Sequence, residues 1–206
     1  LYKGHEIAVH GLNHINLKDA DRIKTETEIF EDKKNLEKLF QTDICGMAYA
    51  FGAYTDESVE IIHNAGLKYA RTTAVTHSFD LEQDMLRYNA TCHHADEKLF
   101  ELGEQFLRLT PDKPQIFYVW GHSYEFDQNT EDNNWGLIER FAEFVSGKED
   151  VWYATNIEIY DYVTAFRSLE ISLSEKIIHN PTAHTIFFEY ETEKRQINPG
   201  ATVCFA

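Results

Sequence analysis

The feature that most limits the fold of this chain is a regular alternation between short apolar β-type runs and amphipathic helical stretches. Such alternation is typical of parallel strands joined by helices that cover the sheet. Up to residue 168 it predicts five β/α units in a row. The strands are predicted at residues 6–10, 44–50, 67–71, 115–120 and 151–155.

Helices are predicted between these strands, where apolar residues recur at helical spacing. Thr55 is a suitable N-cap for the second helix, and Gly66 is a suitable stop for it. Five units are too few for the common eight-stranded barrel. They fit either an open doubly wound sheet or most of a barrel whose first strands lie upstream of Leu1. The helices are predicted at residues 19–40, 56–65, 95–109, 135–145 and 157–166.

The pattern changes after about residue 168. Residues 171–173, 184–190 and 201–205 resemble short strands, and Asn198-Pro199-Gly200 predicts a turn between the last two. We therefore expect a main α/β domain over residues 1–168 and a small antiparallel β appendage over residues 169–206.

Charge and cysteine usage exclude several classes of partner. Asp and Glu number 35 against 19 Lys and Arg, for a formal net charge of −16, so a nucleic acid partner is not expected. Cys45, Cys92 and Cys204 have no paired spacing and are expected to be buried small hydrophobes. No apolar run approaches the length of a membrane span. We expect a soluble protein, with bacterial cytoplasm, periplasm and secretion all left open.

Residues that could take part in catalysis or metal binding cluster at the predicted strand ends. His10 ends the first strand and His14 follows four residues later; Phe51-Gly52 follows the second strand, and His122 follows the fourth. In parallel α/β architectures the carboxyl ends of the strands form the active face. Two histidines four residues apart on a helical turn would face the same way and can share one divalent cation.

Several segments resemble one family in register. Residues 4–14 (GHEIAVHGLNH) resemble the second motif of the polysaccharide deacetylases, carbohydrate esterase family four, where a GHEI-type strand runs into H-[ST]-x-x-H. Residues 48–54 are similar to that family's third-motif loop in the variant AYPFGAY, and residues 67–73 are similar to its next strand. Residues 120–122 (WGH) resemble the late motif that carries the catalytic histidine. The resemblance spans most of residues 3–166.

The resemblance implies a deformed (β/α) barrel and a hydrolase that removes N-acetyl groups from a polysaccharide or oligosaccharide. It implies one divalent metal ion, with zinc expected, held by His10 and His14. His122 would be the general acid that protonates the departing amine. The backbone N–H of Phe51 would help to bind the oxyanion.

The chain also departs from the family pattern. Gly11 stands where a Ser or Thr is usual, and Ala48 and Ala50 replace the Arg and Pro of the third motif. The aspartate motif that should precede the histidines is absent, since only nine residues precede His10. We expect the barrel to lack its first two β/α units and the chain alone to be nearly inactive. The edge strand left bare would then favour a homodimer through residues 2–10.

Two rival functions share these residues: a non-catalytic glycan-binding remnant of a deacetylase, and an O-acetyl ester deacetylase. Cys92-His93-His94 has soft-metal character, but adjacent side chains seldom converge on one ion, so the two histidines are interpreted as loop or substrate-rim residues. Glu125 or Asp127 can orient His122, although solvated loop acids are the simpler interpretation.

Overall fold

The computed structural model describes residues 2–110, 113–131 and 133–205 of a mixed α/β protein. The chain divides into two compact units, Leu1–Tyr153 and Ala154–Ala206. Packing thus groups the last helix with the C-terminal strands, while the expected boundary after residue 168 stays a prediction. Within the described ranges, every helix is too short or too polar to cross a membrane.

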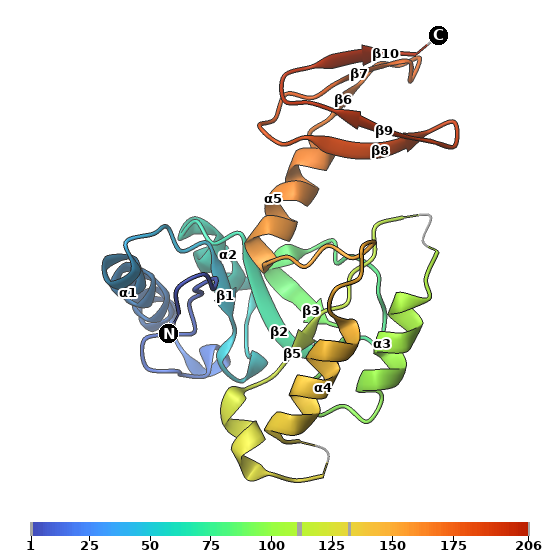
Figure 1. The fold of residues 1–206 in the computed structure, drawn as a ribbon. Helices are drawn as coiled ribbons and strands as arrows, with labels where there is room; N and C mark the ends of the chain where they lie inside the picture. Colours follow the sequence, from blue (N-terminus) through green and yellow to red (C-terminus); the bar gives the residue numbers. More distant parts are fainter. Residues whose placement is uncertain (1, 111–112, 132, 206) are drawn as a thin grey trace. The chain divides into compact units, whose positions relative to one another are not determined.

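The first unit is built on parallel strands (Figure 1). Strands β1 (Gly46–Ala48), β2 (Tyr69–Val75) and β3 (Tyr88–Ala90) form one sheet in that order, with both pairs parallel. Strands β4 (Cys92–His93) and β5 (Val119–Trp120) form a second parallel pair. The α/β class is confirmed. The sheets formed by the described residues do not close, so the barrel stays a prediction.

Residues 6–10 do not form the predicted strand. Only Val9 pairs with the first sheet: its N–H donates to Gly46 O at 2.8 Å, and its carbonyl accepts from Ala48 N at 2.9 Å. Pairing stops there because the N–H groups of His10 and Gly11 donate to a helix carboxylate instead. Association of two chains through residues 2–10 stays a prediction.

The predicted strand at residues 151–155 is also wrong. Its last residue, Thr155, is the N-cap of the following helix and accepts from Glu158 N. The Tyr153 hydroxyl accepts from Lys148 N at 2.9 Å and donates to Val145 O at 2.6 Å. These side-chain bonds tie the segment to the preceding helix end and not to a neighbouring strand.

The helices follow their local signals. Thr55 caps α2 as predicted and forms a reciprocal capping box with Ser58, and Asp21 caps α1 by accepting from Lys24 N. The α-helices are α1 (Arg22–Phe40), α2 (Asp56–Asn64), α3 (Leu99–Leu107), α4 (Trp135–Val145) and α5 (Asn156–Arg167). Short 3-10 turns are η1 (Leu17–Asp19), η2 (Ala50–Gly52), η3 (Met85–Arg87) and η4 (Ser123–Gln128).

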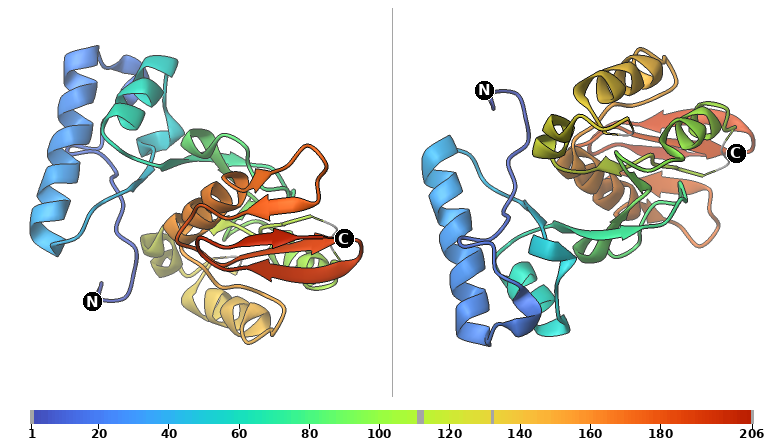
Figure 2. Two further views of the ribbon diagram at one scale, coloured as in Figure 1. Left: turned by 90° about the horizontal axis from the view of Figure 1, so that it is seen from above. Right: turned by 90° about the horizontal axis from the view of Figure 1, so that it is seen from below.

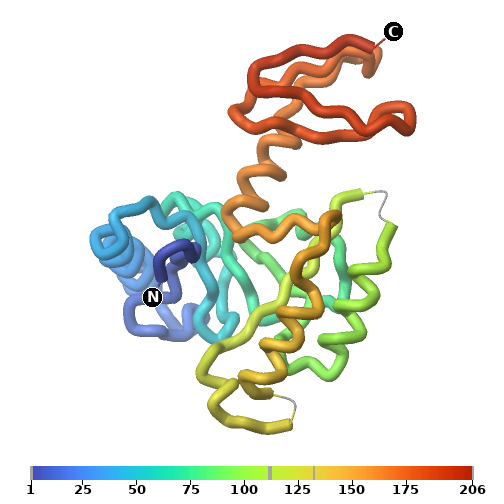
Figure 3. Tube along the Cα trace, in the orientation of Figure 1, coloured from blue at the N-terminus to red at the C-terminus, as the bar shows by residue number. Residues whose placement is uncertain are grey.

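Two apolar cores fix the sheets of the first unit. Helices α1 and α2 lie side by side (Figure 2) and bury a core that includes Val9, Ile29 and Met47. Helices α3 and α4, neighbours in Figure 3, close a second core around Cys92 and Phe141. Cys92 is therefore a buried small hydrophobe as expected, whereas Cys45 is half-buried and Cys204 is exposed, so the expectation is wrong for those two.

The second unit joins α5 to antiparallel strands, the pairing predicted for this region. Strands β10 (Thr202–Cys204), β7 (Ile177–His179) and β6 (Glu170–Ile171) form one sheet in that order. Strands β8 (Ile186–Tyr190) and β9 (Glu193–Ile197) form a hairpin. Its core contains Ala165, Ile178, Ile186 and Ile197.

Candidate functional site

The loop that carries His10 and His14 is held by two carboxylates of α1. Asp32 Oδ2 accepts from the N–H groups of His10 and Gly11, both at 2.9 Å. Glu28 accepts from Asn13 N at 2.8 Å and from Asn13 Nδ2 at 2.6 Å. The expected helical turn is absent, since Gly11 has a φ of +92° and His14 a φ of +54°, both outside the right-handed helical region.

The two imidazoles nevertheless face each other. His10 Nε2 lies 3.1 Å from His14 Nε2, and the ring centroids are 4.7 Å apart. His10 Nδ1 lies 2.7 Å from Ala48 O, so Nδ1 carries the proton and Nε2 presents its lone pair. Two ligands at about 2.1 Å from one ion require a separation of about 3–3.5 Å. The pair has the spacing of two ligands of one cation, and His10 has the tautomer of such a ligand.

The electrostatic setting keeps His10 neutral. Burial lowers the pKa of the His10 imidazole, and the bond to Ala48 O only partly opposes that effect. The charges of His14, Arg71 and His122 lower it further. A neutral imidazole is the form that binds a metal ion.

Phe51 lies beside the histidine pair. Its ring centroid is 4.6 Å from that of His14, its side chain is 66% exposed, and its φ is +58°. Gly52 follows at φ +65°, where an added Cβ would meet Thr73 Oγ1 at 2.0 Å. Left-handed backbone at two consecutive residues, one of them not glycine, is uncommon and is concentrated at functional sites.

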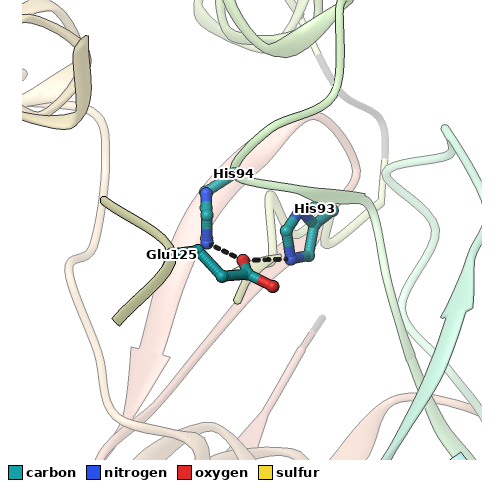
Figure 4. A group of neighbouring side chains, drawn as sticks. All are labelled: His93, His94 and Glu125. Atoms are coloured by element: carbon teal, nitrogen blue, oxygen red, sulfur yellow. Dashed lines mark ion pairs between the residues drawn. The ribbon is translucent and has the colours of Figure 1, made fainter. Parts of the chain in front are cut away.

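His122 belongs to a cluster around Glu125. It is the N-cap residue of η4, and its Nδ1 lies 3.2 Å from Glu125 Oε1. The other carboxylate oxygen, Oε2, lies 3.1 Å from His93 Nε2 and 2.7 Å from His94 Nε2 (Figure 4). The expectation that the adjacent side chains of His93 and His94 would not converge is wrong, because both rings lie next to one carboxylate and His94 is buried. Glu125 is not a solvated loop acid either.

The histidines around Glu125 stabilise its ionised form. Burial alone would raise the pKa of Glu125, but the His122 hydrogen bond and the charges of His93, His122 and His94 outweigh it and lower that pKa. Burial lowers the pKa of His93, and the neighbouring His94 charge adds to the effect. Glu125 is thus ionised at neutral pH and fixes the rings around it.

This cluster also has the composition of a metal site. Within the described part of the chain, His93, His94 and Glu125 form the only group of three candidate ligands, with ligand atoms within 4.8 Å of one another. However, His93 Nδ1 accepts from Ala95 N at 3.1 Å, which places the ring proton on Nε2 and directs it at Glu125. His94 Nε2 lies 2.7 Å from Glu125 Oε2 and 3.2 Å from His122 N, and it can donate to the first only if it does not accept from the second. The His93 tautomer thus favours a carboxylate hub, in which Glu125 accepts from the rings around it, over a cation site.

The hydrogen bonds between α1 and the loop that carries His10 and His14 should contribute to the free energy of unfolding. The Glu28 side chain is buried, with 2% of the residue exposed. Glu28→Ala leaves Asn13 N and Nδ2 without their acceptor and should lower the free energy of unfolding by about 1–3 kcal/mol, measured by urea denaturation. Glu31→Ala is the matched control on the same helix: its ion pair with Lys34 is exposed, so the loss should stay below about 1 kcal/mol. Equal losses would contradict the role given to Glu28.

Comparison with known proteins gives two kinds of match. Residues 1–70, which include His10, His14 and Phe51, match the family model for polysaccharide deacetylase. A solved structure of the Streptococcus pyogenes deacetylase PplD in complex with acetate is 26% identical over 42% of this chain and 38% of that chain, with a TM-score of 0.40. A comparison with curated proteins gives no match.

The second solved structure is a Mycobacterium smegmatis protein assigned to the polysaccharide deacetylases. It is 15% identical over 80% of this chain and 64% of that chain, with a TM-score of 0.50. At this identity the similarity concerns the fold alone. The chain thus spans 38% and 64% of the lengths of the two solved proteins.

Proposed function

We propose that this chain, whose residues 1–70 match the family model for polysaccharide deacetylase, is a metal-dependent hydrolase of that family that removes N-acetyl groups from a glycan. The observation that carries the proposal is the His10–His14 pair, with Nε2 atoms 3.1 Å apart and His10 Nδ1 bonded to Ala48 O. A backbone carbonyl that holds the second ring nitrogen is the usual support of a metal-ligating histidine.

His10 and His14 would hold the metal ion, with zinc expected. A divalent ion there would polarise the acetyl carbonyl and activate water. The chain's own contribution is to present both lone pairs: Asp32 and Glu28 hold the loop, and the Ala48 carbonyl fixes the His10 tautomer.

His122 would supply the proton to the departing amine. Its Nδ1 faces Glu125 Oε1, which leaves Nε2 to carry and deliver that proton. The negative charge of Glu125 stabilises the imidazolium that the step requires. Phe51, next to His14, would contribute its backbone N–H to the oxyanion.

A second candidate is a glycan-binding protein without catalytic activity. It is favoured by one observation: among the described residues, His10 and His14 do not belong to any group of three candidate ligands.

We propose that the missing carboxylates and the first two β/α units of the barrel belong to a segment upstream of this chain. An O-acetyl ester would use the same residues.

The test is zinc-dependent acetate release from N-acetylglucosamine oligomers, measured on the 206-residue chain and on the product of the whole reading frame. We expect the whole product to be active with zinc and inactive with a chelator. The 206-residue chain should be slower by about 10²–10⁴, the usual contribution of a positioned general base. Release that is insensitive to the chelator, or binding without release by the whole product, would contradict the proposal.

A further inference from the structure

Glu125 contacts His122 within one short turn, and that contact alone does not fix its carboxylate. His122 is the N-cap residue of η4, and its Nδ1 lies 3.2 Å from Glu125 Oε1. The terminal torsion of a glutamate side chain is broad, so a bond to one oxygen leaves the carboxylate free to rotate. The orientation of Glu125 toward His122 therefore depends on what holds its second oxygen, Oε2.

The second oxygen is held from the sheet by His93. This residue lies on β4, and its Nε2 is 3.1 Å from Glu125 Oε2 (Figure 4). Its Nδ1 accepts from Ala95 N at 3.1 Å, and its ring packs edge-on against Trp120, its register partner on β5, with centroids 4.8 Å apart. Burial lowers the pKa of His93, so the ring carries one proton at neutral pH, and that proton lies on Nε2, facing Glu125.

His94 cannot take over this role from His93. Its Nε2 lies near both Glu125 Oε2 and His122 N, and the two contacts require opposite states of that nitrogen. Among the described residues, its Nδ1 is buried without a hydrogen-bond partner that would fix the tautomer. His93 is therefore the ring whose own hydrogen bonds require it to donate to Glu125.

We infer that His93 is a positioning residue for His122, which it orients through Glu125. By holding Oε2, His93 keeps Oε1 directed at His122 Nδ1. The inference rests on the proposed function, in which His122 is the general acid. As the C–N bond of the acetamide group breaks, its electron pair goes to the nitrogen, and His122 gives that nitrogen the proton of Nε2. Loss of His93 should slow this transfer and leave glycan binding unchanged.

Two substitutions separate this role from a structural one, because each removes one hydrogen bond of His93. His93→Asn keeps an acceptor for Ala95 N and loses the donor to Glu125. His93→Gln keeps a donor in the place of Nε2 and loses the acceptor. In the product of the whole reading frame, with zinc and N-acetylglucosamine oligomers, His93→Asn should lower kcat by about 10–100-fold at unchanged KM, and His93→Gln by less than about tenfold. A structural role predicts the opposite order.

His77→Asn is the matched control. His77 Nε2 lies 2.6 Å from Asp96 Oδ2, a histidine–carboxylate contact that does not involve Glu125, so kcat should not change. A second substrate tests the proton transfer itself. p-Nitrophenyl acetate releases p-nitrophenolate, which departs without protonation and needs no general acid. His93→Asn should keep its rate on this ester, whereas a damaged site would lose activity on both substrates.

NMR of the metal-free 206-residue chain tests the positioning without any activity. The ¹⁵N shifts of the His122 ring report which nitrogen carries the proton of the neutral imidazole. We expect the Nδ1–H form in the wild type and in His93→Gln, since Glu125 accepts from Nδ1. In His93→Asn we expect a mixture with the Nε2–H form.

An unchanged kcat in a folded His93→Asn, equal losses on the two substrates, or the same His122 form in His93→Asn and the wild type would overturn the inference. If His93→Asn does not fold, His93→Gln decides: a kcat lowered by about 100-fold contradicts the positioning role, and retained activity supports it. No acetate release by the wild-type product would instead contradict the proposed function. The ring spectra of His122 would still decide the inference, so the two proposals fail separately.

Discussion

His14→Ala should weaken zinc binding by at least about 100-fold. His10 and His14 present their Nε2 atoms to each other at 3.1 Å, and removal of one ring leaves a single imidazole donor. The measurement is a competition titration against a fluorescent zinc chelator at neutral pH. The His14 side chain is exposed, so its loss should leave the free energy of unfolding of the metal-free protein nearly unchanged.

The matched control is His63→Ala. His63 lies on α2 and is exposed. Zinc affinity should not change in that variant. If His14→Ala and His63→Ala bind zinc as well as the wild type, the metal is held elsewhere and His10 and His14 lose the role proposed for them.

The second large effect concerns Gly121 and the carboxylate hub. A Cβ at this position would lie 1.6 Å from His94 Cδ2 and 2.2 Å from His94 Nε2. His94 is buried and its Nε2 lies 2.7 Å from Glu125, so the ring has little room to move. Gly121→Ala should lower the free energy of unfolding by about 1–3 kcal/mol and displace His94 from Glu125.

Thermal unfolding followed by circular dichroism measures this loss. Gly136→Ala is the matched control, since the nearest atoms to an added Cβ there are Asn134 Oδ1 at 3.3 Å and Arg140 Nη1 at 3.5 Å, both on side chains. Within α4 alanine should be neutral or stabilise by up to about 1 kcal/mol. A Gly121→Ala protein as stable as the wild type would show that the close packing of Gly121 on His94 is not needed for the fold.

The sequence predicted best those elements whose signals are local. Helix α4 has the predicted bounds, Trp135–Val145, because Asn134 caps it and its apolar residues recur at helical spacing. Thr55 likewise marks the start of α2. Strands depend on partners distant in the chain. Residues 6–10 therefore do not form the predicted strand, and pairing ends at Val9, after which the N–H groups of His10 and Gly11 donate to the carboxylate of Asp32.

The same distinction holds for the site. The spacing of His10 and His14 is visible in the sequence, although the turn that joins them is not helical. The convergence of His93 and His94 on Glu125 was missed, since it depends on β4 pairing with β5 and on the tight approach of Gly121. The pairing of Arg71 with Ala48 across two strands is a tertiary fact of the same kind.

The most direct test of the account is anomalous X-ray diffraction at the zinc absorption edge, from crystals of this chain soaked in zinc. Two histidine clusters compete for the ion within one unit. We predict a peak within about 2.0–2.2 Å of both His10 Nε2 and His14 Nε2. A peak found only between His93, His94 and Glu125 would contradict the account, because the metal would then be held by the cluster that we interpret as a carboxylate hub.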